Sequence, residues 1–312
     1  MRILVVGAGA TGGYFGGRLA QAGRDVTFLV REKRAEELQR SGLVVKSPRG
    51  DFTLRGVKTV LASTIAQPYD LVLLSCKAYN LDDAIESFAP AVGDTTMILP
   101  VLNGMRHIDV LKQRFGDTKV LGGQCVIAAT LNRDREIVHL NDMHSIGFGE
   151  LTGGVSERVR AIASTFEGAG FDFAAADNIL QQMWEKWVFL ATLATSTCLH
   201  RAAIGDILTT LDGRRVIEGI LGECKAVAQA NGHPISDAAN TRAQGILFAE
   251  GSLLTASMLR DIEGQSRIEA DHIVGDLIAR GGDEQQQGSL SLLRIAYSHL
   301  KAYEARLARQ AA

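Results

Sequence analysis

The chain has 312 residues, which suits two domains of about 100–200 residues each better than a single hydrophobic core. Its hydrophobic content of 46% is typical of a globular protein, and a formal net charge of −2 without a long basic run argues against a nucleic-acid partner. The longest strongly apolar stretch, near residues 187–194, is much shorter than a membrane span, so we expect no membrane partner either.

The cysteines and histidines give no sign of a metal site. The four cysteines include no CxxC pair, and the seven histidines are scattered without close pairs. We therefore expect no metal, and reduced, mostly buried thiols in a cytoplasmic protein. The apolar residues 3–6 lead directly into a glycine turn, which is not the pattern of a secretory signal.

The first residues carry a dinucleotide-binding motif. Residues 3–6 are typical of a strand buried on both faces, and Gly7-x-Gly9-x-x-Gly12 follows them before a helical pattern begins. Gly7 allows a tight turn, Gly9 lets a pyrophosphate approach the backbone, and Gly12 lets helix and strand pack closely. The N–H groups and the positive end of the helix dipole would hold phosphate charge. A cofactor loop is thus favoured over a plain glycine turn, made of Gly7, Ala8, Gly9, Ala10, Thr11 and Gly12.

The second predicted strand, residues 26–30, ends at Arg31, where the ribose of a dinucleotide should lie. An Asp or Glu at this position usually binds the 2′-hydroxyl of NAD, whereas an Arg accommodates the 2′-phosphate of NADP. Arg31, Lys33 and Arg34 crowd the position, and Glu32 is the only opposing charge. The pattern favours NADP(H) over NAD, although a solvated basic turn would also explain Lys33 and Arg34.

Strands and helices continue to alternate up to about residue 177. Residues 42–61 are typical of a polar hairpin with its turn at 48–51. A helix is predicted over about residues 81–88. Further strands are predicted at 71–74, 97–102, 120–130, 137–140, 145–148 and 171–174.

From residue 178 onward the pattern is helical almost without interruption, with turns predicted at Gly205, 231–234 and 281–282. The expected fold is an α/β N-terminal Rossmann domain, residues 1–177, with a doubly wound, mostly parallel sheet. A mainly α-helical C-terminal domain, residues 178–312, follows it.

Two polar residues stand at the ends of predicted strands. Lys77 follows strand 71–74, and Asn103 follows strand 97–102. Ligands of doubly wound sheets bind outside the carboxyl ends of the strands. We therefore expect Lys77 and Asn103 to share one crevice with the glycine turn and Arg31.

Several motifs together resemble the ketopantoate reductases (2-dehydropantoate 2-reductases). They are the glycine motif, Lys77-Ala78, Asn103-Gly104-Met105, Met183-Trp184-Glu185-Lys186 and Ser257-Met258-Leu259-Arg260-Asp261. The resemblance covers nearly the whole chain, and the motifs stand in the family's order. It implies a Rossmann domain with a helical C-terminal domain, and NADPH-dependent reduction of a 2-oxo acid to a 2-hydroxy acid. In the family that reaction is commonly ketopantoate to pantoate, in pantothenate biosynthesis.

Two catalytic residues are implied by the resemblance. Lys186 matches the family's catalytic lysine, whose ammonium group can stabilise charge on the keto oxygen and donate the proton. Its apolar neighbours would pull its pKa toward neutrality, whereas the alternative is a lysine that reaches solvent from an amphipathic helix. Glu269 matches the family's acidic residue; by sequence alone it could be an ordinary first-turn glutamate.

Other matched positions imply roles in binding. Ser257 matches a serine that orients substrate, and Asn103 an asparagine near nicotinamide and substrate. Lys77 matches a position beside the cofactor. For each of them a structural role is the alternative, since Asn-Gly alone is a strong turn pattern. Asp261 also matches, although a structural role at a helix end explains it equally well.

The sequence departs from the family in its expected substrate contacts. Members that act on ketopantoate carry asparagines four and eight residues after the lysine, where this chain has Leu190 and Ala194. A third asparagine is replaced by Leu254. Apolar residues cannot grip a hydroxyl or a carboxylate, so a 2-oxo acid with a more apolar side chain is an alternative substrate.

Other functions stay open at this stage. A cofactor-binding sensor without activity would keep the glycine motif while losing Lys186 or Glu269, both of which are present. A dehydrogenase acting on an alcohol or an imine would share the fold. We expect closure of the two halves over a small-molecule substrate. A homodimer is an open alternative, because the sequence does not determine the oligomeric state.

Overall fold

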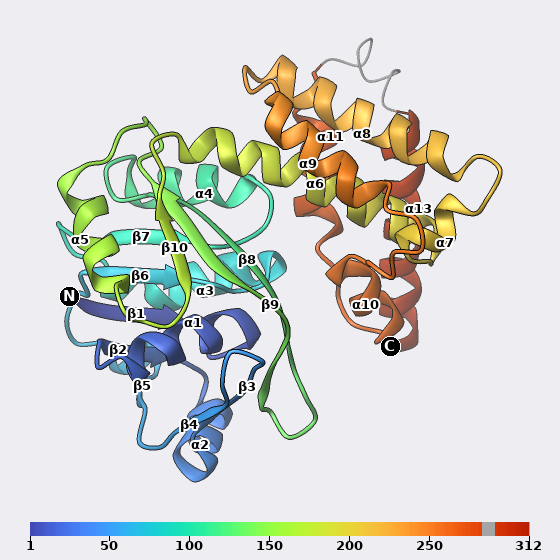
Figure 1. The fold of residues 1–312 in the computed structure, drawn as a ribbon. Helices are drawn as coiled ribbons and strands as arrows, with labels where there is room; N and C mark the ends of the chain where they lie inside the picture. Colours follow the sequence, from blue (N-terminus) through green and yellow to red (C-terminus); the bar gives the residue numbers. More distant parts are fainter. Residues whose placement is uncertain (283–290, 312) are drawn as a thin grey trace. The chain divides into compact units, whose positions relative to one another are not determined.

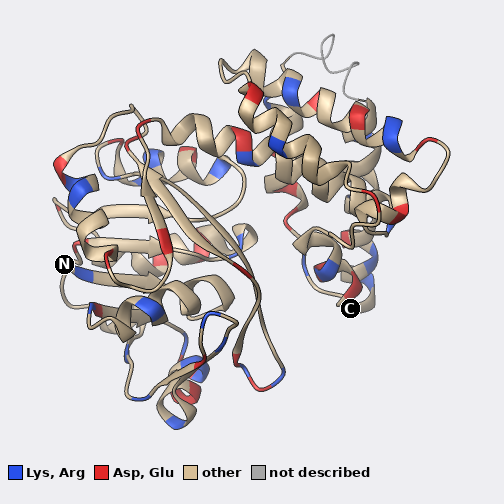
Figure 2. Ribbon diagram, in the orientation of Figure 1, with Lys and Arg blue, Asp and Glu red and all other residues tan. Residues whose placement is uncertain are grey.

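The computed structural model describes residues 1–282 and 291–311 of the chain (Figure 1). It divides into two compact units. The N-terminal unit comprises Met1–Leu102 and His107–Leu180, and the helical unit comprises Asn103–Arg106 and Gln181–Ala312. Figure 2 shows that Lys and Arg are interspersed with Asp and Glu in both units, without a large region of one sign.

A parallel sheet forms the centre of the N-terminal unit. Its strand order is β5-β2-β1-β6-β7, in which every neighbouring pair is parallel. The strands are β1 (Arg2–Val6), β2 (Asp25–Leu29), β5 (Lys58–Val60), β6 (Leu71–Leu74) and β7 (Met97–Pro100). All four residues of β6 and of β7 are buried, because both faces of such a sheet are covered. This order is that of a Rossmann fold, so the predicted fold class is confirmed.

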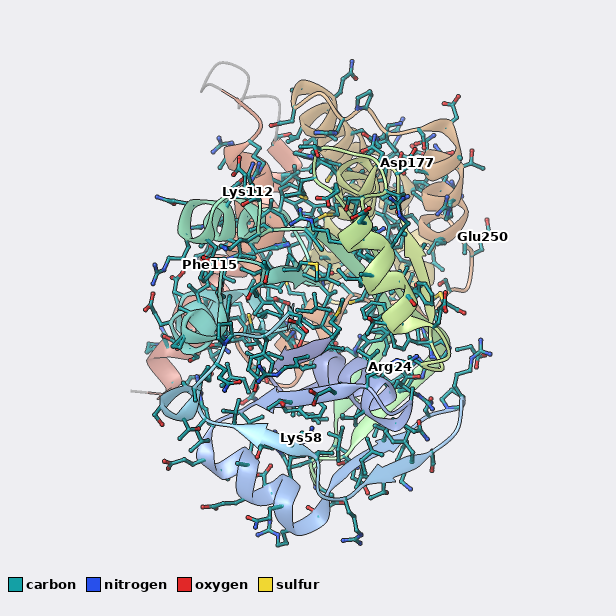
Figure 3. The ribbon with its side chains drawn as sticks, turned by 90° about the vertical axis from the view of Figure 1, so that its left-hand side faces the viewer. Arg24, Lys58, Lys112, Phe115, Asp177 and Glu250 are labelled. Carbon is teal, nitrogen blue, oxygen red and sulfur yellow. The ribbon has the colours of Figure 1, made fainter. Side chains whose placement is uncertain are left out.

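Helices follow the parallel strands. They are α1 (Ala10–Gln21), α2 (Glu32–Ser41), α3 (Leu81–Phe88), α4 (Arg106–Phe115) and α5 (Glu157–Phe166), with short 3-10 turns η1 (Ala62–Thr64), η2 (Ala78–Asn80) and η3 (Ala89–Ala91). Helix α3 has the predicted bounds. Phe115 at the end of α4, labelled in Figure 3, stacks on Phe88 at the end of α3 with ring centroids 5.3 Å apart.

A second sheet covers α1. It has the strand order β10-β9-β3-β4, and a further strand pairs with β9 in the antiparallel sense. Its strands are β3 (Leu43–Lys46), β4 (Phe52–Leu54), β8 (Gly122–Leu131), β9 (Ile137–Gly149) and β10 (Asp172–Ala175). Glycines let α1 approach both sheets: a Cβ at Gly16 would lie 2.7 Å from Phe28 of β2, and one at Gly17 would lie 2.9 Å from Leu43 of β3.

Two strand predictions in this unit were wrong in extent. The hairpin predicted over residues 42–61 is confined to β3 and β4, because residues 58–60 form the edge strand of the parallel sheet instead. There Lys58 (Figure 3) forms an ion pair with Asp25 of β2, Nζ to Oδ1 2.7 Å. The two strands predicted at 137–140 and 145–148 are one continuous strand, β9.

The long helix α6 (Ile179–His200) contributes its residues from Gln181 onward to the helical unit. It is followed by α7 (Ile204–Leu208), α8 (Gly213–Ala230), α9 (Asp237–Leu247), α10 (Ser257–Glu263), the π-helical turn η4 (Asp271–Gly275), α11 (Asp276–Ala279) and α13 (Ser291–Ala311). Gly205 was predicted to mark a turn but lies inside α7. A Cβ there would come within 2.5 Å of the Ser252 nitrogen, so this glycine permits close packing. Within residues 1–282 and 291–311, no helix combines the length and hydropathy that a membrane crossing requires.

Candidate active site

The glycine turn between β1 and α1 has the geometry of a phosphate-binding loop. Gly7 has φ +93, a conformation that favours glycine, and its N–H donates to the Leu29 carbonyl of β2 at 3.0 Å. Gly9 is the N-cap residue of α1, and Ala10 and Thr11 open the helix, so their N–H groups belong to the first turn, which lacks intrahelical partners. These groups are the donors that a pyrophosphate would use.

The three glycines of this turn differ in how closely their surroundings pack. A Cβ atom built on Gly7 or Gly9 would meet no atom of the described chain within 4 Å. At Gly12, by contrast, a Cβ would lie 2.4 Å from the Gly7 carbonyl oxygen and 2.1 Å from the Ser75 hydroxyl oxygen. The turn is therefore open on the side of the first two glycines and closely packed at the third.

Arg31 and Arg34 have different environments although both follow β2. Arg31 is the N-cap residue of α2, and its side chain is 85% exposed, with a weak ion pair of 3.9 Å to Asp83. Arg34 is largely buried: it donates to the carbonyl oxygen of Ala8 in the glycine turn at 3.2 Å and pairs with Glu37 at 3.0 Å. The sequence alternative of a solvated side chain is thus wrong for Arg34, which supports the turn.

Lys77 is partly buried; it immediately precedes η2 and lies three residues after the end of strand β6. Since β2, β1 and β6 are parallel neighbours, their carboxyl ends place Arg31, the glycine turn and Lys77 along one edge of the sheet. Asn103 follows β7 in sequence, but it groups with the helical unit.

In the helical unit, Lys186 and Asn103 are in direct contact. The Lys186 Nζ donates to the Asn103 Oδ1 at 3.1 Å. Lys186 is partly buried on α6, and its sequence neighbours Trp184 and Trp187 are buried, with ring centroids 5.1 Å apart. The amide oxygen of Asn103 thereby limits the positions that the ammonium group can take, unlike a lysine extended over the surface.

Glu269 lies immediately before the helical segment that contains η4, and it is 7% exposed. Its backbone carbonyl accepts from the Ile273 N–H at 3.0 Å. His272 is on the same turn, where burial first and then the charge of Arg106 hold the pKa of its imidazole below the ordinary value, although the charge of Glu269 opposes them. Glu269 and Arg106 therefore both act electrostatically on His272, with opposite signs.

The other predicted residues lie further along α6 and at the start of α10. Leu190 is partly buried and Ala194 is buried, one and two helical turns beyond Lys186 on the same face. Ser257 is exposed at the first position of α10. The preceding Ala256 N–H donates to the Thr197 hydroxyl at 3.4 Å, which holds the start of α10 against α6.

Sequence reasoning missed Arg34 as a support of the glycine turn, and it missed Trp187. The Trp187 indole N–H donates to the Ile273 carbonyl of η4 at 3.0 Å. A tryptophan next to a candidate catalytic lysine was the available indication. The π-helical turn had no sequence pattern that would have predicted it, although such turns are frequent at functional sites.

Comparison with known proteins identifies the family. The family model described as "Ketopantoate reductase PanE/ApbA" matches residues 3–153, and its C-terminal counterpart, "Ketopantoate reductase PanE/ApbA C terminal", matches residues 178–304. The "Uncharacterized oxidoreductase YkpB" of Bacillus subtilis is 36% identical over 305 residues, which cover 98% of this chain and 99% of that protein.

Solved structures agree with this result. The crystal structure of 2-dehydropantoate 2-reductase from Methylococcus capsulatus is 30% identical, with a TM-score of 0.86 and 98% of each chain covered. A D-mandelate dehydrogenase, solved with NADH and anilino(oxo)acetate, shares the fold at a TM-score of 0.86 but only 20% identity, with 98% of this chain and 99% of that one covered. From the two family models and the first of these structures, the chain belongs to the ketopantoate reductase family of oxidoreductases.

Proposed function

We propose that the protein reduces a 2-oxo acid to the corresponding 2-hydroxy acid, with NADPH as the reductant and Lys186 as the proton donor. The observation that carries the proposal is the 3.1 Å hydrogen bond from the Lys186 ammonium group to the Asn103 side chain. This hydrogen bond joins two residues that match the motifs of the ketopantoate reductase family. A bound reduced nicotinamide would supply the hydride.

Lys186 would act on the oxygen of the substrate's keto group. When the carbonyl carbon is reduced, negative charge develops on that oxygen, and a fixed ammonium group stabilises it and then donates a proton. Asn103 uses its amide oxygen to keep the ammonium group oriented. The substrate loses its carbonyl double bond and gains one hydride at carbon and one proton at oxygen, which gives the 2-hydroxy acid.

Glu269 and Ser257 would orient the substrate. Glu269 is buried directly before the helical segment whose His272 carbonyl packs against Gly104, and its carboxylate can accept a hydrogen bond from a substrate hydroxyl. Ser257 would donate from the start of α10, a segment held against α6. Both roles stay proposals carried by the family motif.

Arg31 supports the choice of NADPH. Its guanidinium group is exposed at the carboxyl end of β2, where a 2′-phosphate would lie. Its ion pair with Asp83 is weak at 3.9 Å, so a bound phosphate could replace that contact. Lys77, at the same edge of the sheet, would add positive charge. The fold alone does not decide the cofactor, because the D-mandelate dehydrogenase with this fold was solved with NADH.

The substrate is proposed to be a 2-oxo acid with a more apolar side chain than ketopantoate. Leu190 and Ala194 continue the α6 face from Lys186, and neither can hydrogen-bond a hydroxyl. Leu254 is a third apolar position, whose backbone carbonyl accepts from the Ile204 N–H at 3.1 Å. Ketopantoate itself is the alternative within the same reaction.

A substrate panel tests the proposal. NADPH consumption would be followed with ketopantoate, 2-oxoisovalerate and phenylglyoxylate, and each assay would be repeated with NADH. We expect turnover with NADPH and a preference for the apolar acids; a large preference for ketopantoate would refute the apolar-substrate proposal alone. If the protein binds NADPH but oxidises none of it with any of the acids, the reductase proposal is wrong and a sensor role replaces it.

Arg31→Ala tests the cofactor preference, with Lys33→Ala, an exposed lysine two residues later in the first turn of α2, as the matched control. Removal of the guanidinium group should weaken NADPH binding and leave NADH binding nearly unchanged, because only the phosphate contact is lost. An Arg31→Ala protein that keeps its preference for NADPH would contradict this assignment.

A further inference from the structure

Three segments far apart in the sequence carry Asn103, Lys186 and Glu269, and all three meet around Trp187. The ring of Trp187 is 1% exposed, next to Lys186 on α6. Its N–H donates to the Ile273 carbonyl of η4 at 3.0 Å. Only Ala270 separates Glu269 from η4. The bond from Trp187 to Ile273 therefore connects the helix that carries Lys186 to the segment that carries Glu269.

Gly104, which follows Asn103, packs against both η4 and Trp187. This glycine has φ +82, and a Cβ there would lie 2.6 Å from the His272 carbonyl oxygen of η4. The same Cβ position is 3.9 Å from the Trp187 indole nitrogen. The backbone after Asn103 therefore packs directly on the π-helical turn, with space for glycine only.

The turn η4 is also held from a second direction. The Tyr297 hydroxyl of α13 donates to the Asp271 carboxylate at 2.6 Å, and a Cβ at Gly275 would lie 3.0 Å from the Tyr297 ring. The π-helical spacing itself appears in the Asp276 N–H, which donates to the Asp271 carbonyl five residues earlier. Tyr297 and Trp187 thus fix the same turn, but only Trp187 also adjoins Lys186.

From these contacts we propose that Trp187 and Gly104 are positioning residues, which set the separation of the Lys186 ammonium group from the Asn103 amide and from Glu269. The inference rests on the proposed role of Lys186. A proton donor must lie within hydrogen-bond reach of its acceptor, about 2.6–3.2 Å. A misplacement of about 1 Å can lower a rate about 100-fold. The indole N–H and the missing side chain at 104 together prevent that displacement.

The test compares Trp187→Phe with Tyr297→Phe. Each variant keeps an aromatic ring and removes one hydrogen bond to η4. Trp187→Phe also shrinks a fully buried side chain, so its larger loss of stability is measured separately by urea unfolding. We expect kcat with the accepted 2-oxo acid to fall about tenfold or more in Trp187→Phe, with unchanged affinity for NADPH, and to stay near wild type in Tyr297→Phe. Gly104→Ala should lower kcat in the same way. Equal losses of kcat in Trp187→Phe and Tyr297→Phe would overturn the proposal.

A second measurement does not depend on turnover. Lysines would be reductively methylated with a carbon-13 label, and the Lys186 resonance assigned by its loss in Lys186→Arg. Its chemical shift should move in Trp187→Phe and stay in place in Tyr297→Phe, because only the first change releases the ammonium group from its present position. If the resonance is unaffected by Trp187→Phe, the positioning role is wrong. If it moves while no 2-oxo acid is reduced, the positioning role stands and the proposed function fails.

Discussion

A side chain at Gly12 in α1 should displace the glycine turn. In Gly12→Ala the new Cβ would lie 2.4 Å from the Gly7 carbonyl oxygen and 2.1 Å from the Ser75 hydroxyl oxygen. Ser75 can rotate away at the loss of its 3.2 Å hydrogen bond to the Val6 carbonyl. The Gly7 carbonyl is backbone and can move only if the whole turn moves.

The magnitude follows from two opposing effects. Overpacking of this kind lowers the free energy of unfolding by about 1–3 kcal/mol. Replacing Gly by Ala inside a helix raises it by about 0.8–1 kcal/mol. The net loss of stability should be between about 0 and 2 kcal/mol. Displacement of the turn should also weaken dinucleotide binding about tenfold, or about 1.4 kcal/mol.

Gly222→Ala is the matched control. Gly222 is an exposed residue inside α8, and a Cβ there would meet no described atom within 4 Å. The free energy of unfolding of this variant should rise by about 0.5–1 kcal/mol, and its affinity for NADPH should be unchanged. Urea unfolding followed by circular dichroism gives the stabilities, and calorimetry with NADPH gives the affinities. A Gly12→Ala protein that is stabilised like Gly222→Ala, or that binds NADPH as wild type does, would refute the reasoning.

Three further predictions concern pH, thiols and specificity. Burial is the main cause that holds the pKa of His144 below its unfolded value of 6.5, so the unfolded state binds the proton more readily and stability should fall as pH drops below about 6.5. The charges of Arg49, His139 and Arg18 lower the pKa of His144 as burial does, whereas the charge of Asp172 raises it. The Tyr14 hydroxyl forms a hydrogen bond with the His144 Nδ1 at 2.7 Å. His144→Gln should flatten the pH dependence of the unfolding free energy between about pH 7 and 5, and an unchanged slope would show that His144 is not its origin. Burial raises the pKa of Cys198 and of Cys224 to about 12, so a thiol reagent at neutral pH should label Cys76 and Cys125 long before these two, and equal labelling rates would contradict the burial. Leu190→Asn should raise the kcat/KM of ketopantoate relative to that of phenylglyoxylate by about tenfold or more, because an amide can pair with the substrate hydroxyl; no change in the ratio would remove Leu190 from the specificity pocket.

Much of the fold was predictable because its strongest elements have unambiguous patterns. The run at residues 71–74 is apolar throughout and lies in the middle of a sheet covered on both faces, where such runs belong. Helix α3 has an apolar face in helical spacing and kept its predicted bounds. The predicted fold class and the family are confirmed.

The errors arise where tertiary contacts decide. The strand at residues 58–60 has three residues and no apolar pattern, so its place beside β2 depends on pairing that the sequence does not display. Gly205 has the composition of a turn, but it serves close packing inside α7. Arg34 has the appearance of a solvated cation, yet its guanidinium group is committed to the Ala8 carbonyl and to Glu37.

At the candidate site, residue types were predictable and their partners were not. The motif predicts Asn103 and Lys186 separately, but 83 positions separate them and only the fold shows that their side chains touch. The contact between Gly104 and η4 is equally non-local. The roles proposed for Glu269 and Ser257 stay predictions.

The most direct measurement of the central claim is the single-turnover rate of a Lys186→Gln protein mixed with NADPH and an accepted 2-oxo acid. Removal of the ammonium group should slow NADPH oxidation about 100-fold or more, the usual contribution of a positioned general acid, while NADPH affinity is unchanged. A Lys186→Gln protein that oxidises NADPH at the wild-type rate would show that the proton comes from another group.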